Sequence, residues 1–142
     1  MPQTFITHSK EETQQVAADF ARTLSGGEVI ALLGDIGAGK TTFTQGLVGA
    51  LESTARVKSP TFAVLHEYPI TGHSTIRTIV HIDFYRFTSP DEVRALELES
   101  YQRPDTVVVA EWPDLAGDRL TSVSHQITFR GLNETDREIT FL

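Results

Sequence analysis

Hydrophobic residues recur along the first third of this chain with two spacings that alternate. Ser9 and Glu12 have the spacing of a capping box, and the apolar positions after them recur at helical intervals until two glycines at 26–27 end the pattern. This stripe comprises Val16, Ala17, Phe20, Ala21 and Leu24. The run 29–33 is apolar throughout, which is typical of a strand covered on both faces. After a glycine-rich turn at 34–39, helical spacing returns and predicts a second helix through Phe43, Leu47, Val48 and Leu51.

A hairpin and a short helix are predicted next. Two strand-like runs, 62–68 and 75–82, flank a turn region at 69–74, which favours an antiparallel hairpin. Ser89 is a good N-cap and is followed by proline at the first helical position. We therefore expect a helix from there to about Leu98.

The last third of the chain contains three strand-like stretches. The run 107–110 is apolar throughout and predicts a buried parallel strand. The stretches 123–129 and 137–142 flank a polar turn at 133–136. Strands that alternate with helices predict an α/β layer architecture.

Composition indicates one globular domain over residues 1–142. Hydrophobic residues make up 39% and charged residues 22%, which supports a buried core. Twelve Lys and Arg against nineteen Asp and Glu leave a formal net charge of −7, which disfavours capture of a nucleic acid by the chain alone. Cysteine is absent, which excludes disulfides and cysteine nucleophiles. Without a secretory-type N-terminus or an apolar run of about 18 residues, we expect a soluble cytoplasmic protein with no membrane partner.

One motif points to specific chemistry. Residues 34–41 read G-D-I-G-A-G-K-T and match the phosphate-binding pattern G-x-x-x-x-G-K-[ST] between a predicted strand and a predicted helix. Its glycines let backbone N–H groups point at an anion, next to the positive end of the helix dipole. Lys40 supplies a mobile positive charge for the β- and γ-phosphates, Thr41 a hydroxyl ligand for Mg²⁺, and Thr42 is placed to reach the α-phosphate. The predicted nucleotide-binding residues are Asp35, Gly37, Ala38, Gly39, Lys40, Thr41 and Thr42.

This motif also narrows the fold class. A P-loop between a buried strand and a helix predicts a fold like that of P-loop NTPases. We expect a three-layer α/β sandwich with a mixed, largely parallel central sheet and antiparallel edge strands.

Two acidic residues follow predicted strands and are candidates for binding the metal. Glu111 follows the more continuous apolar run, so we assign it, with Thr41, to metal ligation. Asp83 is then available to orient water, to hold the metal's second shell or to bind Lys40. For each acid, the alternative is a solvated side chain at a strand end.

Four further residues have two interpretations each. Ser59 and Thr61 lie where GTPase-type proteins keep a loop that senses the γ-phosphate, although a proline-marked turn explains the spacing equally well. Arg86 is a candidate for stabilising phosphate charge, or a partner in a structural ion pair. Trp112 lies beside the nucleotide or an interface, or packs in the core. His81 shares a strand face with Asp83, but the histidines show no metal-ligand spacing.

In order and spacing, these motifs resemble the TsaE family, also called YjeE, of small P-loop ATPases in bacterial threonylcarbamoyladenosine modification of tRNA. The resemblance covers most of the chain. Ile36 stands where the family usually has Leu. Ile82 and Phe84 are apolar residues at the two variable positions of the family pattern H-x-D-x-Y-R. The matching blocks are Glu12-Thr13, GDIGAGKTTF at 34–43, VKSPTF at 57–62, HEY at 66–68, HIDFYR at 81–86 and EWP at 111–113.

The resemblance implies Mg²⁺-dependent ATP hydrolysis that supports TsaD and TsaB in threonylcarbamoyl transfer to position 37 of tRNA, with tRNA contacted only through the complex. It implies metal ligation by Thr41 and Glu111 and places Thr13 and Arg137 near the nucleoside. A switch-like role falls on Ser59 to Thr61. The implied catalytic residues are Lys40, Thr61, Asp83 and Glu111.

Two other functions would use the same phosphate-binding loop. A small-molecule P-loop kinase needs an acceptor pocket and usually a lid with several arginines, and only Arg94 and Arg103 are suitably spaced here. A nucleotide-sensing binding module would bind without turnover. The motif does not select the base, but the chain lacks an Asn-Lys-x-Asp guanine signature and, with the resemblance, this favours ATP.

Overall fold

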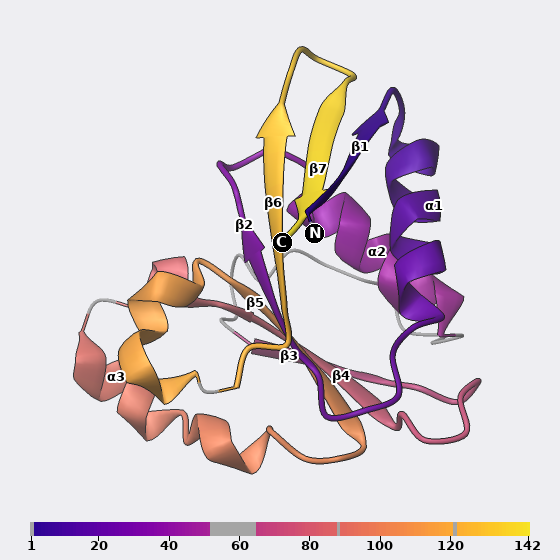
Figure 1. Ribbon diagram of the computed structural model, residues 1–142. Coiled ribbons are helices and arrows are strands. Elements are labelled where there is room, and N and C mark those ends of the chain that lie inside the picture. The colour runs from indigo at the N-terminus through magenta and orange to yellow at the C-terminus, as the bar shows by residue number, and fades with distance from the viewer. Residues whose placement is uncertain (1, 52–64, 88, 121) are drawn as a thin grey trace.

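Seven strands form one mixed sheet in the computed structural model, which describes residues 2–51, 65–87, 89–120 and 122–142 (Figure 1). Their order across the sheet is β1-β7-β6-β2-β5-β4-β3. The strands are β1 (Gln3–Thr7), β2 (Val29–Leu33), β3 (Leu65–Pro69), β4 (Thr78–Asp83), β5 (Thr106–Glu111), β6 (His125–Gly131) and β7 (Arg137–Phe141).

The centre of the sheet is parallel and its edges are antiparallel. β2 pairs in parallel with β5 and β6, and β5 pairs in parallel with β4. The pairs β1–β7, β6–β7 and β3–β4 are antiparallel. The predicted mixed sheet with antiparallel edge strands is confirmed, and so is the hairpin of β3 and β4.

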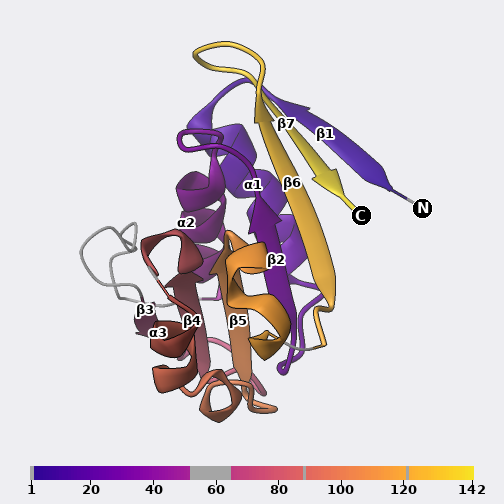
Figure 2. The same cartoon turned by 90° about the vertical axis from the view of Figure 1, so that its left-hand side faces the viewer.

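Helices cover both faces of this sheet, as the three-layer prediction requires. α1 (Lys10–Ala21) and α2 (Lys40–Ala50) pack together on one face, and α3 (Pro90–Ala95) lies on the other (Figure 2). Within the described ranges, the 3₁₀ turns are η1 (Phe84–Arg86), η2 (Leu98–Ser100) and η3 (Pro113–Arg119). No helix of the described ranges is long and apolar enough to cross a membrane.

Both faces of the central strands are buried, so the apolar runs of β2 and β5 belong to two cores. Toward α1 and α2, the core includes Ile30, Leu32, Phe43, Leu47, Val107 and Val109. Toward α3, η2 and η3, it includes Val29, Val80, Val93, Leu98, Val108 and Ala110. Strand alternation therefore assigns each residue of β5 to one core or the other, and Glu111 falls on the face of α1 and α2.

The N-terminus of α1 is capped as predicted. Ser9 Oγ accepts a hydrogen bond from the backbone N–H of Glu12 at 3.1 Å, and Glu12 Oε1 accepts one from the backbone N–H of His8 at 3.0 Å. These bonds satisfy backbone donors that a helix start leaves without partners. The helix ends at Ala21, and Leu24 reaches the core from the turn that follows.

Two predicted boundaries were wrong by three residues. The helix that was expected to reach Leu98 ends at Ala95, because Glu97 has a left-handed backbone with φ 53°. β4 begins at Thr78 rather than at residue 75. The N–H groups of Thr75 and Ile76 donate instead to His73 Nδ1, at 3.1 and 3.0 Å.

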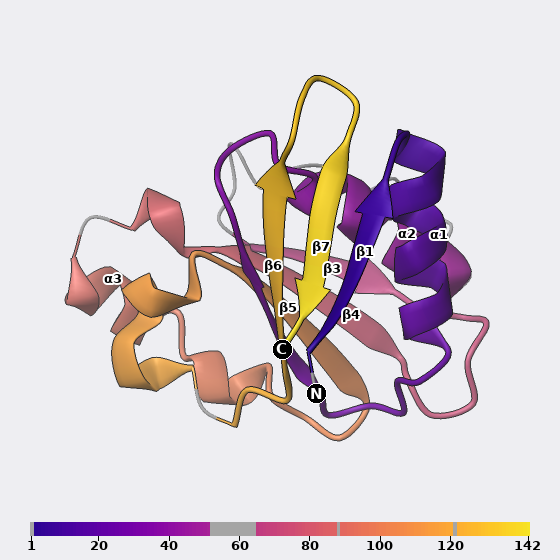
Figure 3. The same cartoon turned by 45° about the horizontal axis from the view of Figure 1, so that its top comes forward.

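The hydrophobic pattern predicts no strand before Ser9, whereas the structure has β1 there, paired with β7 beside α1 (Figure 3). Thr7 is the one buried residue of this edge strand, so its sequence lacks a clear apolar alternation. The Thr7 and Thr13 hydroxyls hydrogen-bond at 2.7 Å. This bond connects β1 directly to α1.

The two helices of one layer approach each other closely at Gly46 of α2. A Cβ added there would lie 2.5 Å from the backbone oxygen and 2.6 Å from the Cα of Gln14 in α1. Backbone atoms cannot rotate away, so a side chain at this position would force the helices apart. Gly49 is an exposed residue of the same helix, and a Cβ added there meets nothing within 4 Å.

We predict that Gly46→Ala lowers the free energy of unfolding by about 1–3 kcal/mol through overpacking. Gly49→Ala is the matched control, and it is expected to raise stability by up to about 1 kcal/mol because alanine loses less backbone entropy in a helix. Urea unfolding of both variants measures the difference. An unchanged or increased stability of Gly46→Ala would contradict the close packing of α1 on α2.

Candidate nucleotide-binding site

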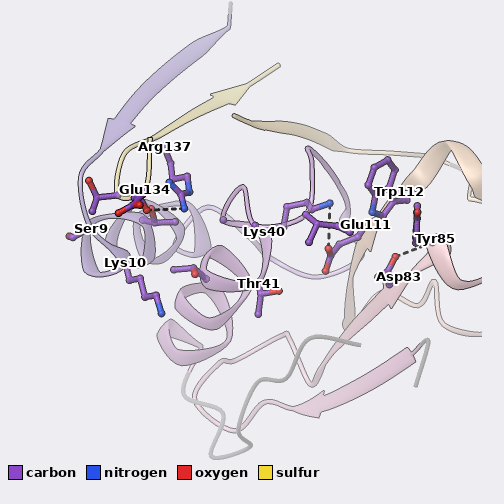
Figure 4. Close-up of a pocket in the computed structure, with 16 residues that line it drawn as sticks. Ser9, Lys10, Lys40, Thr41, Asp83, Tyr85, Glu111, Trp112, Glu134 and Arg137 are labelled. Atoms are coloured by element: carbon purple, nitrogen blue, oxygen red, sulfur yellow. Dashed lines mark hydrogen bonds and ion pairs between the residues drawn. The ribbon is translucent and has the colours of Figure 1, made fainter. Parts of the chain in front are cut away.

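The loop after β2 and the carboxyl ends of β4 and β5 line a cleft of about 690 Å³. Figure 4 shows Ser9, Lys10, Glu134 and Arg137 at one end of this cleft. Residues at the other end come from the ends of β4 and β5 and from the turns that follow them, namely Asp83, Tyr85, Glu111 and Trp112. Lys40 and Thr41, which open α2, lie between the two ends.

The loop from residue 34 to residue 39 presents the start of α2 to this cleft. Gly39 is the N-cap of α2 with φ 112°, and no side chain caps the helix. Gly34 has φ 150°, and a Cβ there would lie 2.6 Å from the Phe129 backbone oxygen. Only glycine therefore fits at these two turns. The first amide groups of α2 remain available to an anion, with the positive end of the helix dipole behind them.

Lys40 extends from the first position of α2 into the floor of the cleft. Its side chain is 5% exposed, and Nζ donates to the Gly34 carbonyl oxygen at 2.5 Å. Nζ also lies 3.6 Å from Glu111 Oε1 and 4.6 Å from the ring centre of Trp112. The ammonium group thus has a carbonyl, a carboxylate and an aromatic face around it, which compensates for its burial.

Glu111 ends β5 and carries a buried charge beside Lys40. One carboxylate oxygen faces Lys40, and the other, Oε2, lies 2.6 Å from His81 Nε2. Burial by itself raises the pKa of Glu111, but the hydrogen bond from His81 and the charges of His81 and Lys40 outweigh it, so the pKa is lowered from its ordinary value. Glu111 is therefore ionised at neutral pH.

Asp83 ends the neighbouring strand β4 and is paired in register with Glu111. Its Oδ1 accepts a hydrogen bond from the backbone N–H of Tyr85 at 2.9 Å. Burial, and to a lesser degree the charge of Glu111, raise the pKa of Asp83 despite that bond. The pKa values of the two carboxylates are therefore shifted in opposite directions. Lys40 makes its ion pair with Glu111 rather than with Asp83.

Two oxygen donors that line the cleft suit Mg²⁺. Thr41 offers a hydroxyl and Glu111 an ionised carboxylate, and both line the cleft. Among the described residues, no group of three or more His, Cys, Asp or Glu side chains could hold a metal ion by itself. Mg²⁺ takes few protein ligands and completes its shell with water and phosphate oxygens, so this donor set fits it.

Arg137 lies at the opposite end of the cleft from Asp83 and Glu111 (Figure 4), and Thr13 also lines the cleft. Thr13 is buried, and its hydroxyl is bonded to Thr7. Arg137 Nη1 donates to the carbonyl oxygens of Asn133 and Asp136, at 2.8 and 2.9 Å. These bonds hold the guanidinium group against the turn between β6 and β7.

The structure brings most of the predicted site residues together. The cleft is lined by Thr13, Gly37, Gly39, Lys40, Thr41, Thr42, Asp83, Glu111 and Arg137. Asp35 and Ala38 line a smaller neighbouring recess, which also contacts Gly37 and Arg137. Ser59 and Thr61 lie outside the described residues, as does the side chain of Arg86.

Aromatic residues at the cleft were only partly predicted. Trp112 lines the cleft and also packs partly against the core. Its place beside a nucleotide or an interface stays a prediction. The ring of Tyr85 lies 5.1 Å from that of Trp112, and Tyr85 was not among the predicted site residues. Sequence spacing puts His81 on the face of Asp83, but its contact with Glu111 follows only from the register of β4 and β5.

Comparison with known proteins shows the family of this chain. Residues 7–139 match the family model described as "Threonylcarbamoyl adenosine biosynthesis protein TsaE". The chain belongs to the TsaE family. The family resemblance stated from the sequence motifs is thereby confirmed.

Individual TsaE proteins match most of the chain. The tRNA threonylcarbamoyladenosine biosynthesis protein TsaE of Bacillus subtilis is 37% identical over 135 residues, which are 95% of this chain and 82% of that protein. The protein of the same name from Aquifex aeolicus is 35% identical, over 73% of this chain and 82% of its own length. A solved structure, Bacillus subtilis YdiB, superposes with a TM-score of 0.76 at 32% identity, covering 99% of this chain and 84% of that one.

The raised pKa of Asp83 leads to a stability prediction. An acid whose pKa is higher in the folded state than in the unfolded state favours folding only at low pH, and this contribution is lost as pH rises through the folded-state pKa. We therefore expect Asp83→Asn, which retains an oxygen for the Tyr85 N–H, to raise the unfolding temperature at pH 7 in the absence of nucleotide.

Thermal unfolding from pH 3 to pH 8 measures this effect. The gain of Asp83→Asn should shrink toward zero as pH falls below the usual Asp pKa, about 3.9. A gain that is independent of pH, or a loss at pH 7, would show that the charge of Asp83 is not the destabilising element.

Proposed function

We propose that this chain is a Mg²⁺-dependent ATP-binding and ATP-hydrolysing subunit that supports threonylcarbamoyl transfer to position 37 of tRNA, acting with TsaD and TsaB. One observation supports this most strongly: the phosphate-binding loop, Lys40 and the ionised Glu111 meet in one cleft, in a chain of the TsaE family. The names of its relatives supply the pathway.

The loop at residues 34–39 and the first residues of α2 bind the phosphates. The amides of residues 35 and 37–42 surround the phosphates, as anion-binding loops at helix N-termini do. Lys40 is already at the cleft floor, and its ammonium group exchanges the Gly34 carbonyl for phosphate oxygens when ATP binds. Thr13 and Arg137, which both line the cleft, are assigned to the nucleoside.

We assign Mg²⁺ binding to Thr41 and Glu111. When bound, the ion neutralises charge that develops on the β- and γ-phosphates. The lowered pKa of Glu111 keeps its carboxylate ionised and ready to ligate. Asp83 is next to Glu111 in register, and we assign to it the orientation of the attacking water.

Partner proteins complete this function. The chain carries a net charge of −7, so affinity for tRNA comes from the assembly with TsaD and TsaB. Tyr85 is 56% exposed at the cleft end where the γ-phosphate belongs, which leaves that end open to a partner. Ser59 and Thr61 are the hydroxyls we assign to sensing the γ-phosphate.

The kinase alternative gains no support from the cleft. Arg94 pairs with Asp91 at 3.0 Å, and Arg103 lies 3.9 Å from Asp105. Neither arginine is among the residues that line the cleft. A lid that covers an acceptor would need such arginines near the γ-phosphate.

We predict that ATP labelled in the γ-phosphate is released as inorganic phosphate, and faster with TsaD and TsaB than without them. The measurement follows the label in both conditions, with a pool of small metabolites present. Transfer of label to a metabolite would favour the kinase. ATP binding without release in either condition would favour the nucleotide-sensing module.

We also predict that Lys40→Met, which keeps the apolar stem but removes the charge, weakens ATP binding by about 100-fold or more, because a buried charge contact to phosphate is lost. Lys10→Met is the matched control: Lys10 also lines the cleft but is exposed, so its loss should cost less than about 5-fold. Calorimetry measures both affinities. Equal affinities of the two variants would contradict the role of Lys40.

A further inference from the structure

His81 is a fully buried imidazole in the strand next to Glu111. It has 0% exposure, and β4 places it two residues before Asp83 on the face that carries α1 and α2. Its register partner in β5 is Val109, which lies two residues before Glu111 on that same face. His81 therefore lies diagonally across from Glu111, one step deeper in the sheet.

The contact between these two side chains is short and directional. His81 Nε2 lies 2.6 Å from Glu111 Oε2, whereas Oε1 of the same carboxylate faces Lys40 at 3.6 Å. The other ring nitrogen, Nδ1, has no hydrogen-bond partner within the described part of the chain. Glu111 is thus the polar group to which the described structure ties the imidazole.

Core packing alone does not account for a histidine at this position. The neighbours of His81 on this face include Ile79, Val107 and Val109, and all three are fully buried and apolar. A leucine would fill the same layer without the cost of burying a polar ring. What an apolar side chain cannot supply is an N–H donor aimed at one oxygen of Glu111.

We propose that His81 is a positioning residue that orients the Glu111 carboxylate. Its Nε2–H donates to Oε2, fixes the plane of the carboxylate and leaves Oε1 turned toward Lys40 and the cleft. This inference rests on the proposed function, in which Glu111 ligates Mg²⁺. Residues that hydrogen-bond to a metal-ligating side chain hold it in the productive orientation, and their loss weakens metal binding about 10–100-fold.

The test measures how much Mg²⁺ strengthens nucleotide binding, not turnover. Calorimetry gives the affinity for a non-hydrolysable ATP analogue with Mg²⁺ and again in EDTA, and the ratio of the two is the metal's contribution. Four variants are compared with the unaltered chain: His81→Leu, His81→Asn, His81→Gln and Ile79→Val. Glutamine places an amide N–H near the position of Nε2, asparagine is too short to reach Oε2, and Ile79→Val perturbs the same face of β4 without touching Glu111.

We expect the affinity ratio to fall about 10-fold or more in His81→Leu and His81→Asn, with the affinity in EDTA changed by no more than about two-fold. His81→Gln should recover most of the ratio, and Ile79→Val should keep it. Thermal unfolding checks that each variant is folded. If His81→Leu does not fold, the affinity ratios of His81→Asn and His81→Gln are compared instead. Both variants bury an amide, but only the glutamine side chain is long enough to reach Glu111 Oε2.

A folded His81→Leu or His81→Asn variant with an unchanged ratio would overturn the positioning role, and so would a His81→Gln variant no better than His81→Asn. The effect of Mg²⁺ on the unaltered chain tests the proposed function separately from the positioning role of His81. If Mg²⁺ does not strengthen binding to the unaltered chain, Glu111 holds no metal, and the proposed function and the inference both fall.

Discussion

Two opposite charges buried at the same edge of the sheet constrain the structure around them. Lys40 is 5% exposed and Glu111 6% exposed, and their charged groups lie 3.6 Å apart. A charge that is buried alone loses its hydration and gains nothing in return, which is strongly unfavourable. An opposite charge nearby and well-placed hydrogen bonds compensate for that loss. Gly34 supplies such a bond to the ammonium group and His81 to the carboxylate. Lys40 and Glu111 therefore stabilise each other's burial.

That pair determines which parts of the chain must be neighbours. Lys40 is the first residue of α2 and Glu111 the last of β5, so their contact requires β5 to lie beside β2, whose loop leads into α2. Register then places Leu32 opposite Glu111, and Glu111 opposite Asp83 one strand further on. The parallel centre of the sheet thus brings a cation and two carboxylates to one edge. Parallel α/β sheets commonly bind ligands at the carboxyl ends of their strands.

The parts of the fold that were predictable are those that local sequence controls. The apolar runs of β2 and β5, the Ser9 cap and the glycine-rich loop each carry their signal within a few residues, and each was found where expected. β1 was missed because an edge strand that buries one threonine has little hydrophobic pattern and is held by pairing with β7, whose residues are 130 or more positions away. The end of α3 was misplaced because the left-handed backbone of Glu97 depends on its surroundings.

The same distinction applies to the cleft. Lys40, Thr41, Asp83 and Glu111 follow from motifs and strand ends, and the structure brings them together. No local sequence motif predicts a contact between two strands. The hydrogen bond between His81 and Glu111 and the packing of Tyr85 on Trp112 could therefore be found only from the sheet register. Opposite pKa shifts of Asp83 and Glu111 likewise arise from their surroundings. Burial, with a smaller effect of the Glu111 charge, raises the pKa of Asp83, whereas His81 and Lys40 outweigh burial at Glu111 and lower its pKa.

The most direct measurement of the central claim is a crystal structure grown with a non-hydrolysable ATP analogue and Mn²⁺, with the ion located by its anomalous scattering. The proposed function predicts phosphates on the amides of residues 35 and 37–42 and manganese held by Thr41 and Glu111. Phosphates bound away from that loop, or manganese bound where neither Glu111 nor Asp83 faces it, would contradict it.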